Sequence, residues 1–141
     1  VKAGEGARAI NRDTIHVPAL VRMLRDRRTW VSKVARRFGR LIRRRIAVPA
    51  FHPGAAHEVL PWNPHVFAVL RTARNGERVL ALTNVSSREQ EIIVPREIAG
   101  DTAAWEDLIS RRRVPVTATG IEVRLGPYEV LWLTPMAVLL P

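Results

Sequence analysis

At Pro49 the sequence changes from one periodicity to another, and no single element can continue through that change. Before Pro49, apolar residues recur every three or four positions, which is the spacing of one helix face. After it, short runs rich in β-branched and aromatic residues alternate with Pro, Gly and Asn, a pattern typical of antiparallel sheet. We therefore predict a helical segment over residues 1–48 and a separate small β-domain over residues 49–141.

The helical segment is expected to contain two helices. Pro18 suits the first turn of a short helix over residues 18–25, because proline lacks the N–H that is unpaired there. A longer helix is predicted over residues 29–46, with Thr29 as its N-cap and Pro49 preventing its continuation. Its apolar face consists of Trp30, Val31, Val34, Ala35, Phe38, Leu41, Ile42 and Ile46. Such a stripe must be covered by another element, and nothing suitable precedes it in the sequence.

The formal net charge of +10 is concentrated in this helical segment. Residues 1–48 carry a balance of +11, whereas residues 49–141 carry a balance of −1. The face of the longer helix opposite the apolar stripe holds Lys33, Arg36, Arg37, Arg40, Arg43 and Arg44. A solvated exterior is the usual role of such a face. Binding to nucleic-acid phosphates is the alternative, but the apolar stripe and the lack of a nucleic-acid motif argue against nucleic acid as a partner.

The β-domain is expected to contain about six strands, in a sandwich or Greek-key arrangement. Asn75 and Gly76 tolerate positive φ and predict a tight hairpin turn between the hydrophobic runs of residues 66–72 and 78–84. The proline-rich stretch of residues 47–65 is expected to be a long irregular connection. The predicted strands cover residues 66–72, 78–84, 90–94, 105–108, 121–125 and 129–133.

The histidines and serines of the β-domain match no known metal-binding or catalytic motif. His52, His57 and His65 have spacings that match no common metal pattern, so no metal or other cofactor is expected. Ser86 and Ser87 lack the Gly-x-Ser-x-Gly motif of serine hydrolases. Among the tryptophans, Trp132 is expected to fill the sandwich core, and Trp62 is the candidate for a sugar-stacking position on the surface.

Composition limits which classes of protein this chain can belong to. The chain has no cysteine, which excludes disulfides and thiolate chemistry and is consistent with a cytoplasmic location. No apolar run approaches the roughly 18 residues that would span a bilayer, and residues 1–13 have no signal-peptide core, so no membrane partner is expected. The chain is expected to begin within a longer protein, because it has no starting methionine and opens on a helical segment without a partner.

Several short motifs, taken in order, resemble the C-terminal end of the sucrose-phosphorylase-like glycosidases of the α-amylase superfamily (glycoside hydrolase family 13). They are ARAINRD at residues 7–13, PAFHP at 49–53, VFAVLRT and GERVLALTNVS within 66–86, and GPYEVLWL at 126–133. The resemblance implies that residues 1–48 are the tail of a catalytic (β/α)8 barrel, ending in its last helices. It also implies that residues 49–141 are the β-sandwich that follows the barrel and stabilises it.

That resemblance also implies a reaction, in which a carboxylate nucleophile and a carboxylic acid transfer a glucosyl group with retention to phosphate or water. Catalytic carboxylates of this family lie earlier in sequence, so no catalytic residue is assigned in this chain. Arg12 matches the arginine of the Ile-Asn-Arg motif, and the resemblance implies that it contacts the acceptor, a sugar or phosphate, with Asn11 beside it. Ala9, Asp13 and Thr14 continue the motif differently, which leaves the acceptor open. The expected partners are the upstream barrel, the sugar substrate and phosphate.

Overall fold

The computed structural model describes residues 16–136. Its internal contacts divide the chain into two units that meet between Ile42 and Arg43, and each is described by itself. The domain boundary predicted at residues 48 and 49 stays a prediction.

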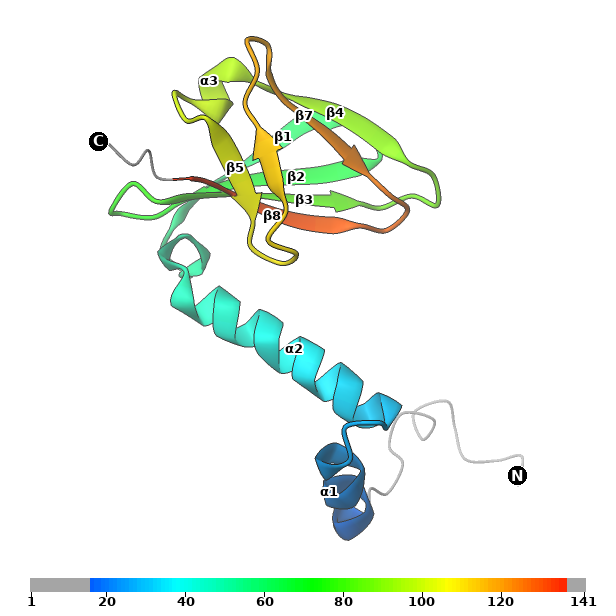
Figure 1. Ribbon diagram of the computed structural model, residues 1–141. Helices are drawn as coiled ribbons and strands as arrows, with labels where there is room; N and C mark the ends of the chain where they lie inside the picture. The colour runs from blue at the N-terminus through cyan, green and yellow to red at the C-terminus, as the bar shows by residue number, and fades with distance from the viewer. Residues whose placement is uncertain (1–15, 137–141) are drawn as a thin grey trace, which may run out of the picture. The chain divides into compact units, whose positions relative to one another are not determined.

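The helical part contains both helices that the sequence predicts. Helix α1 spans Val17–Arg25 and helix α2 spans Trp30–Ala47 (Figure 1). The backbone N–H of Ser32 donates to Oγ1 of Thr29 at 3.2 Å, which confirms Thr29 as the N-cap of α2. No helix of residues 16–136 combines the length and the apolar character that crossing a membrane requires.

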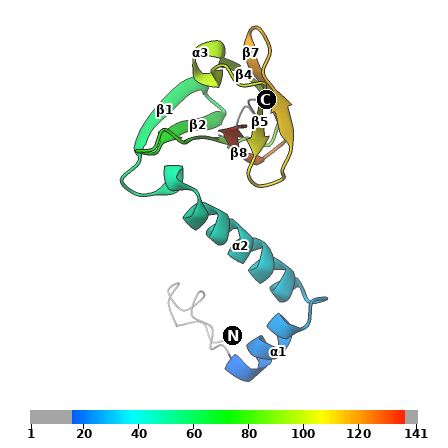
Figure 2. The same ribbon diagram turned by 60° about the vertical axis from the view of Figure 1, so that its left-hand side comes forward.

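The β-domain is built from two antiparallel sheets (Figures 1 and 2). The larger sheet has the strand order β1-β2-β3-β8-β5-β6, and the smaller pairs β4 with β7. Strand β8 returns from the smaller sheet to lie between β3 and β5. The strands are β1 (Ala56–Asn63), β2 (Val66–Thr72), β3 (Arg78–Asn84), β4 (Gln90–Pro95), β5 (Ala104–Asp107), β6 (Arg113–Pro115), β7 (Gly120–Leu125) and β8 (Val130–Pro135). The protein is therefore mainly β, as predicted.

One hydrophobic core fills the space between the two sheets. Alternate residues of the strands point into it, among them Leu80 and Leu82 of β3, Val123 of β7 and Leu133 of β8. Trp105 is fully buried at its centre, and its indole N–H donates to the carbonyl of Ala99 at 2.9 Å. Ala99 ends the short helix α3 (Arg96–Ala99), which follows β4.

Residues 47–65 differ from the irregular connection that the sequence predicted. They contain a 3₁₀ turn, η1 (Pro49–Phe51), and the whole of strand β1. Pro61 is tolerated because β1 is an edge strand, and its register with β2 shifts between Leu60 and Asn63. Strand β6 was also missed, since its three residues show no extended alternation. Residues 49–136 thus form eight strands, where about six were predicted for the domain.

The expected position of Trp132 was wrong as well. Its neighbours Leu131 and Leu133 point into the main core, so Trp132 points to the outer face of the larger sheet. There its ring packs on Phe51 of η1, with ring centroids 4.7 Å apart. Trp105, rather than Trp132, fills the sandwich core.

Candidate functional surfaces

Asn11 and Arg12, the two residues predicted to bind substrate, lie outside the described residues. Their predicted role stays a prediction. The structure does describe the helices that follow them and the β-domain surfaces, so the candidate site is built from these surfaces.

Helices α1 and α2 are joined by a corner held by side chains. The hydroxyl of Ser32 is buried and donates to the carbonyl of Leu24 at 2.8 Å. Arg36 donates to the Ser32 hydroxyl at 2.7 Å and to the carbonyl of Arg27 at 2.9 Å. The bond from Ser32 satisfies a carbonyl in the last turn of α1, which would otherwise lack an intrahelical partner, and the second bond from Arg36 reaches the turn that follows α1. The corner thus fixes the direction of α1 relative to the start of α2.

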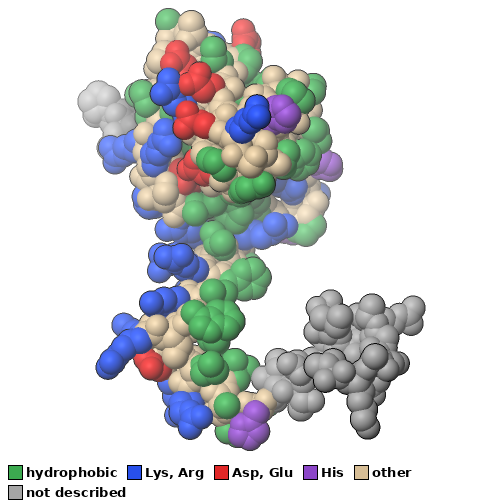
Figure 3. Space-filling view, turned by 90° about the vertical axis from the view of Figure 1, so that its right-hand side faces the viewer, with side chains coloured by type: hydrophobic (Ala, Val, Ile, Leu, Met, Phe, Trp, Pro, Cys, Tyr) green, Lys and Arg blue, Asp and Glu red, His purple; other side chains and the backbone are tan. Residues whose placement is uncertain are grey.

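The apolar face of α2 is largely uncovered in the described part of the chain. Trp30 is 71% exposed, Phe38 64% and Ile46 80%. Figure 3 shows hydrophobic side chains gathered along one side of the helical part, with Lys and Arg side chains on another. A solvent-facing stripe of this size marks a contact surface, because single exposed apolar residues are common whereas contiguous patches are not.

Part of the outer face of the larger sheet is also apolar and open. Val59 of β1, Phe67 of β2 and Val85 after β3 are each more than half exposed. They line a shallow hollow of about 560 Å³ between β1, β2 and the turn after β3. This apolar patch of Val59, Phe67 and Val85 is a second candidate contact surface.

A second, smaller hydrophobic cluster covers another part of that face. Ala50 and Phe51 of η1 pack with Val79 and Trp132. Arg71 holds η1 in place, because its guanidinium donates to the carbonyls of Ala50 at 2.8 Å and His52 at 2.9 Å. The start of the β-domain is therefore fastened to the outer face of its own sheet.

His52 and Ser86 form hydrogen bonds within local turns. Nδ1 of His52 accepts a hydrogen bond from the backbone N–H of Gly54 at 3.0 Å. Within residues 16–136, no group of three or more His, Asp or Glu is placed to hold a metal ion. Oγ of Ser86 donates to Asn84 at 2.8 Å, so Ser86 stabilises a turn. Trp62 is half-buried against the core and lines a small surface hollow beside Glu91 and Ile93.

Two buried polar residues of the β-domain, Asn84 and Asp107, were missed by the sequence reasoning. The Asn84 side chain donates to the carbonyls of Arg88 at 2.7 Å and Gly126 at 2.8 Å, and accepts from Ser86. The Asp107 carboxylate accepts hydrogen bonds from the backbone N–H groups of Ile109, Ser110 and Trp132, and from the Ser110 hydroxyl. Both residues precede a serine by two or three positions, the spacing of turns stabilised by Asn or Asp, and this was the available signal.

Most of the β-domain matches a known protein family. Residues 57–132 match the family described as "Maltogenic Amylase, C-terminal domain". The matched segment runs from β1 to β8 and includes both sheets.

Two curated proteins are similar over most of the chain. The glucosylglycerate phosphorylase of Spirochaeta thermophila is 36% identical over 135 residues, which cover 91% of this chain and 23% of that protein. The glucosylglycerate phosphorylase of Escherichia coli is 31% identical over 126 residues, covering 89% of this chain and 21% of that protein. The chain thus spans less than a quarter of the length of either relative.

Solved structures show the same fold at lower identity. An Anoxybacillus α-amylase aligns with a TM-score of 0.65 at 16% identity, over 80% of this chain and 24% of that one. A mutant of the trehalulose synthase MutB aligns with a TM-score of 0.52 at 22% identity, over 82% of this chain and 19% of that one. Each larger protein contains a segment with the fold of this chain.

Proposed function

The chain belongs to the maltogenic amylase C-terminal domain family, within the α-amylase enzymes of glycoside hydrolase family 13, and on that premise we propose that it is the C-terminal part of a glycoside phosphorylase. In this proposal residues 1–48 are the tail of a catalytic (β/α)8 barrel, and residues 49–141 form the accessory β-domain. The single observation that supports it best is similarity over about nine tenths of the chain to two glucosylglycerate phosphorylases.

The uncovered face of α2 supports the assignment of this helix to a barrel. In a (β/α)8 barrel each outer helix buries an apolar stripe against the strands, while its other face meets solvent. Helix α2 has both faces, with Trp30, Val34 and Phe38 exposed on one and arginines on the other. Burying a large apolar side chain stabilises a protein by about 1.5–3 kcal/mol, so covering this stripe would contribute substantially.

The apolar patch of Val59, Phe67 and Val85 supports an accessory role for the β-domain. We propose that the domain contacts the barrel through this patch and stabilises it. Such a role needs a preformed packed domain rather than catalytic groups. The continuous core between the two sheets provides that domain.

The proposed reaction is retaining transfer of a glucosyl group from a glucoside to phosphate, with hydrolysis as the variant in which water is the acceptor. It requires two carboxyl groups about 5 Å apart, one acting as nucleophile and the other as acid and then base. In the proposed enzyme these groups lie on the barrel upstream of this chain. The chain alone is therefore expected to be inactive.

Arg12 and Asn11 are proposed to contact the acceptor half of the substrate. The planar guanidinium of arginine donates paired hydrogen bonds to phosphate or carboxylate oxygens. The names of the two relatives favour a glycerate group, which carries a carboxylate, over the fructose of sucrose. We therefore propose that the substrate is a glucosylglycerate-like glucoside.

A chimera tests this proposal. The chain would replace the matching C-terminal segment of the Spirochaeta thermophila enzyme, and formation of glucose 1-phosphate from glucosylglycerate and phosphate would be measured. The chimera is expected to be active, whereas the chain alone and the shortened enzyme alone are not. Activity of the chain by itself, or a folded chimera that is inactive while the parent enzyme is active, would contradict it.

A further inference from the structure

We propose that an arginine cluster on the β-domain, formed by Arg44, Arg45, Arg111 and Arg113, binds a phosphate-class anion. All four residues belong to the unit of residues 43–141. They come from the last turn of α2 and from the loop and strand after β5, which are far apart in the sequence. Folding therefore creates this concentration of charge.

Contacts with the outer face of the larger sheet bring the two groups together. Nη1 of Arg44 donates to the carbonyl of Ile109 at 2.7 Å, and Arg45 lies 5.8 Å from the ring centroid of Phe51. Phe51 in turn packs on Trp132 of this face. The last turn of α2 is thus fastened beside the β5–β6 loop.

Arg111 and Arg113 lie on the same face. Arg113 is paired in register with Glu106, whose neighbours on β5, Trp105 and Asp107, are both buried. Because side chains alternate along a strand, Glu106 and Arg113 point outward. Nε of Arg111 lies 3.1 Å from a carboxylate oxygen of Glu106, so Arg111 is on this side too.

The acidic groups nearby do not balance the cluster. Glu106 faces it and forms an ion pair with Arg111. The carboxylate of Asp107 accepts four hydrogen bonds from Ile109, Ser110 and Trp132, and none of these donors is an arginine. Of the four arginines, Arg111 and Arg113 lie beside Glu106, whereas Arg44 and Arg45 contact Ile109 and Phe51 and have no carboxylate partner among these contacts. Clustered guanidinium groups suit the several oxygens of a phosphate.

The backbone at Arg111 is a second, independent indication. Its φ is 68°, in the left-handed region that glycine or asparagine normally occupies. Residues held in this region by the surrounding structure cluster at ligand-binding and switch sites. The structure thus places an arginine with this unusual backbone among basic residues that share a single outward carboxylate, Glu106.

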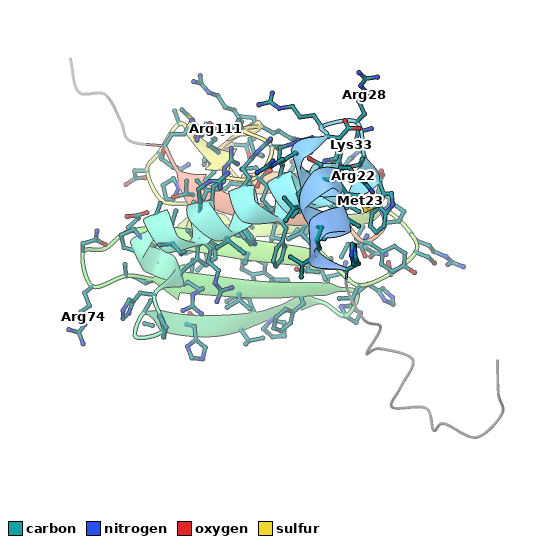
Figure 4. The ribbon with its side chains drawn as sticks, turned by 90° about the horizontal axis from the view of Figure 1, so that it is seen from below. Arg22, Met23, Arg28, Lys33, Arg74 and Arg111 are labelled. Atoms are coloured by element: carbon teal, nitrogen blue, oxygen red, sulfur yellow. The ribbon has the colours of Figure 1, made fainter. Side chains whose placement is uncertain are left out.

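Substitution of Arg111 separates ligand binding from folding. Arg111→Gly removes the guanidinium and relaxes the backbone, so the variant should be at least as stable as the wild type in chloride. It should bind phosphate about tenfold more weakly, because a charge-assisted hydrogen-bonding group is lost. Arg113→Gln should weaken binding without changing the loop backbone. Arg74→Gln is the matched control, since Arg74 lies at the tip of the β2–β3 hairpin, away from Arg111 (Figure 4).

The experiment titrates the 141-residue chain with inorganic phosphate at constant ionic strength, following heat release and thermal unfolding. Phosphate also stabilises proteins generally, because it is excluded from their surface. That non-specific stabilisation should be the same in the wild type and in all three variants. Glucose 1-phosphate is titrated in parallel, and tighter binding than inorganic phosphate would identify a phosphate ester as the ligand. Saturable phosphate or ester binding that Arg111→Gly and Arg113→Gln weaken, and Arg74→Gln does not, supports the proposal.

Equal responses of all four proteins would overturn it, as would binding of a short DNA duplex with no saturable binding of either phosphate. Neither result would bear on the proposed phosphorylase function, which is measured in the chimera. The two proposals can therefore fail separately.

Discussion

Asn84 is the residue on which two turns of the β-domain depend. It is 1% exposed, and its amide joins the turn after β3 to the carbonyls of Leu125 and Gly126 before β8. Its side-chain oxygen accepts from both the backbone and the hydroxyl of Ser86. Buried polar groups of this kind stabilise a fold only when all their hydrogen bonds are made, and here they are.

Asn84→Ala is expected to lower the free energy of unfolding by about 3 kcal/mol, because buried carbonyls lose their donor. Urea denaturation followed by tryptophan fluorescence would measure this change. Asn75→Ala is the control, since the Asn75 side chain accepts one hydrogen bond from Glu77 in an exposed turn. Similar losses in both variants would argue against a special role for Asn84.

Gly120 is required by both its backbone conformation and its surroundings. Its φ is 125°, and an added Cβ would lie 2.0 Å from the carbonyl oxygen of Val94. Gly120→Ala should therefore destabilise the domain by several kcal/mol, on the order of 3 or more, through strain and a clash with backbone. Gly76→Ala has a similar positive φ but open space around the new Cβ, and about 1 kcal/mol is expected. Thermal unfolding would rank the two, and equal costs would mean that the contact with Val94 is relieved elsewhere.

Arg12 carries the prediction that concerns substrate. In the active chimera, Arg12→Lys should raise the KM for glucosylglycerate, because lysine cannot reproduce a paired hydrogen bond to a carboxylate. An increase of about tenfold is expected for the loss of one such bond. Steady-state kinetics would test it, with Arg8→Lys as a nearby control. An unchanged KM would remove Arg12 from the acceptor site.

Among the elements, α2 connects the sequence analysis most directly to the proposed function. Its period predicted a helix over residues 29–46, within one residue of the observed Trp30–Ala47, and the structure shows Trp30 and Phe38 exposed. Most of its apolar stripe, including Val34 and Ile46, is uncovered within the described residues. An isolated chain with such a stripe should self-associate in solution.

Phe38→Glu is expected to reduce that self-association without changing the unfolding of the β-domain, as sedimentation and thermal unfolding would show. Placed in the chimera, the same substitution should destabilise the enzyme by about 3 kcal/mol, because it would bury a charge. Arg40→Gln, on the opposite face, should change neither the self-association of the chain nor the stability of the chimera. If Phe38→Glu left the chimera unchanged, α2 would not be a buried barrel helix.

Secondary structure was predicted correctly where the local sequence pattern was strong. It was predicted wrongly where the position of a residue in the folded sheet determined the outcome. Strands β2 and β3 were predicted with their observed bounds, because a clear Asn75-Gly76 turn separates two hydrophobic runs. Strand β1 was missed because Pro61 argues against a strand, and only its position at a sheet edge makes proline acceptable there. Trp132 was assigned to the wrong face, since its hydrophobicity does not reveal that η1 covers the outer side.

The arginine cluster shows a different limit of sequence reasoning. Basic runs at residues 43–45 and 111–113 are visible in the sequence, but nothing there indicates that they meet. The contact of Arg44 with Ile109 depends on the folded position of the α2 end against β5. The predicted substrate residues Asn11 and Arg12, in contrast, came from a family motif, and they lie outside the described residues.

At the scale of the whole molecule, the chain combines a packed domain with two apolar surfaces that the described residues leave exposed. It has a packed β-domain, an amphipathic helix with an open apolar stripe, and an apolar patch on its larger sheet. Its relatives are more than four times as long as the segment that aligns with them. We propose that a barrel covers both apolar surfaces and performs the chemistry.

Phosphorolysis by the complete gene product tests this account most directly. The reading frame that includes Val1 would be extended upstream, expressed in full, and supplied with glucosylglycerate and inorganic phosphate. The account predicts an upstream (β/α)8 barrel and release of α-glucose 1-phosphate, with the configuration at the anomeric carbon retained. A folded full-length product that lacks such a barrel, or that has one and cleaves no glucoside, would contradict it.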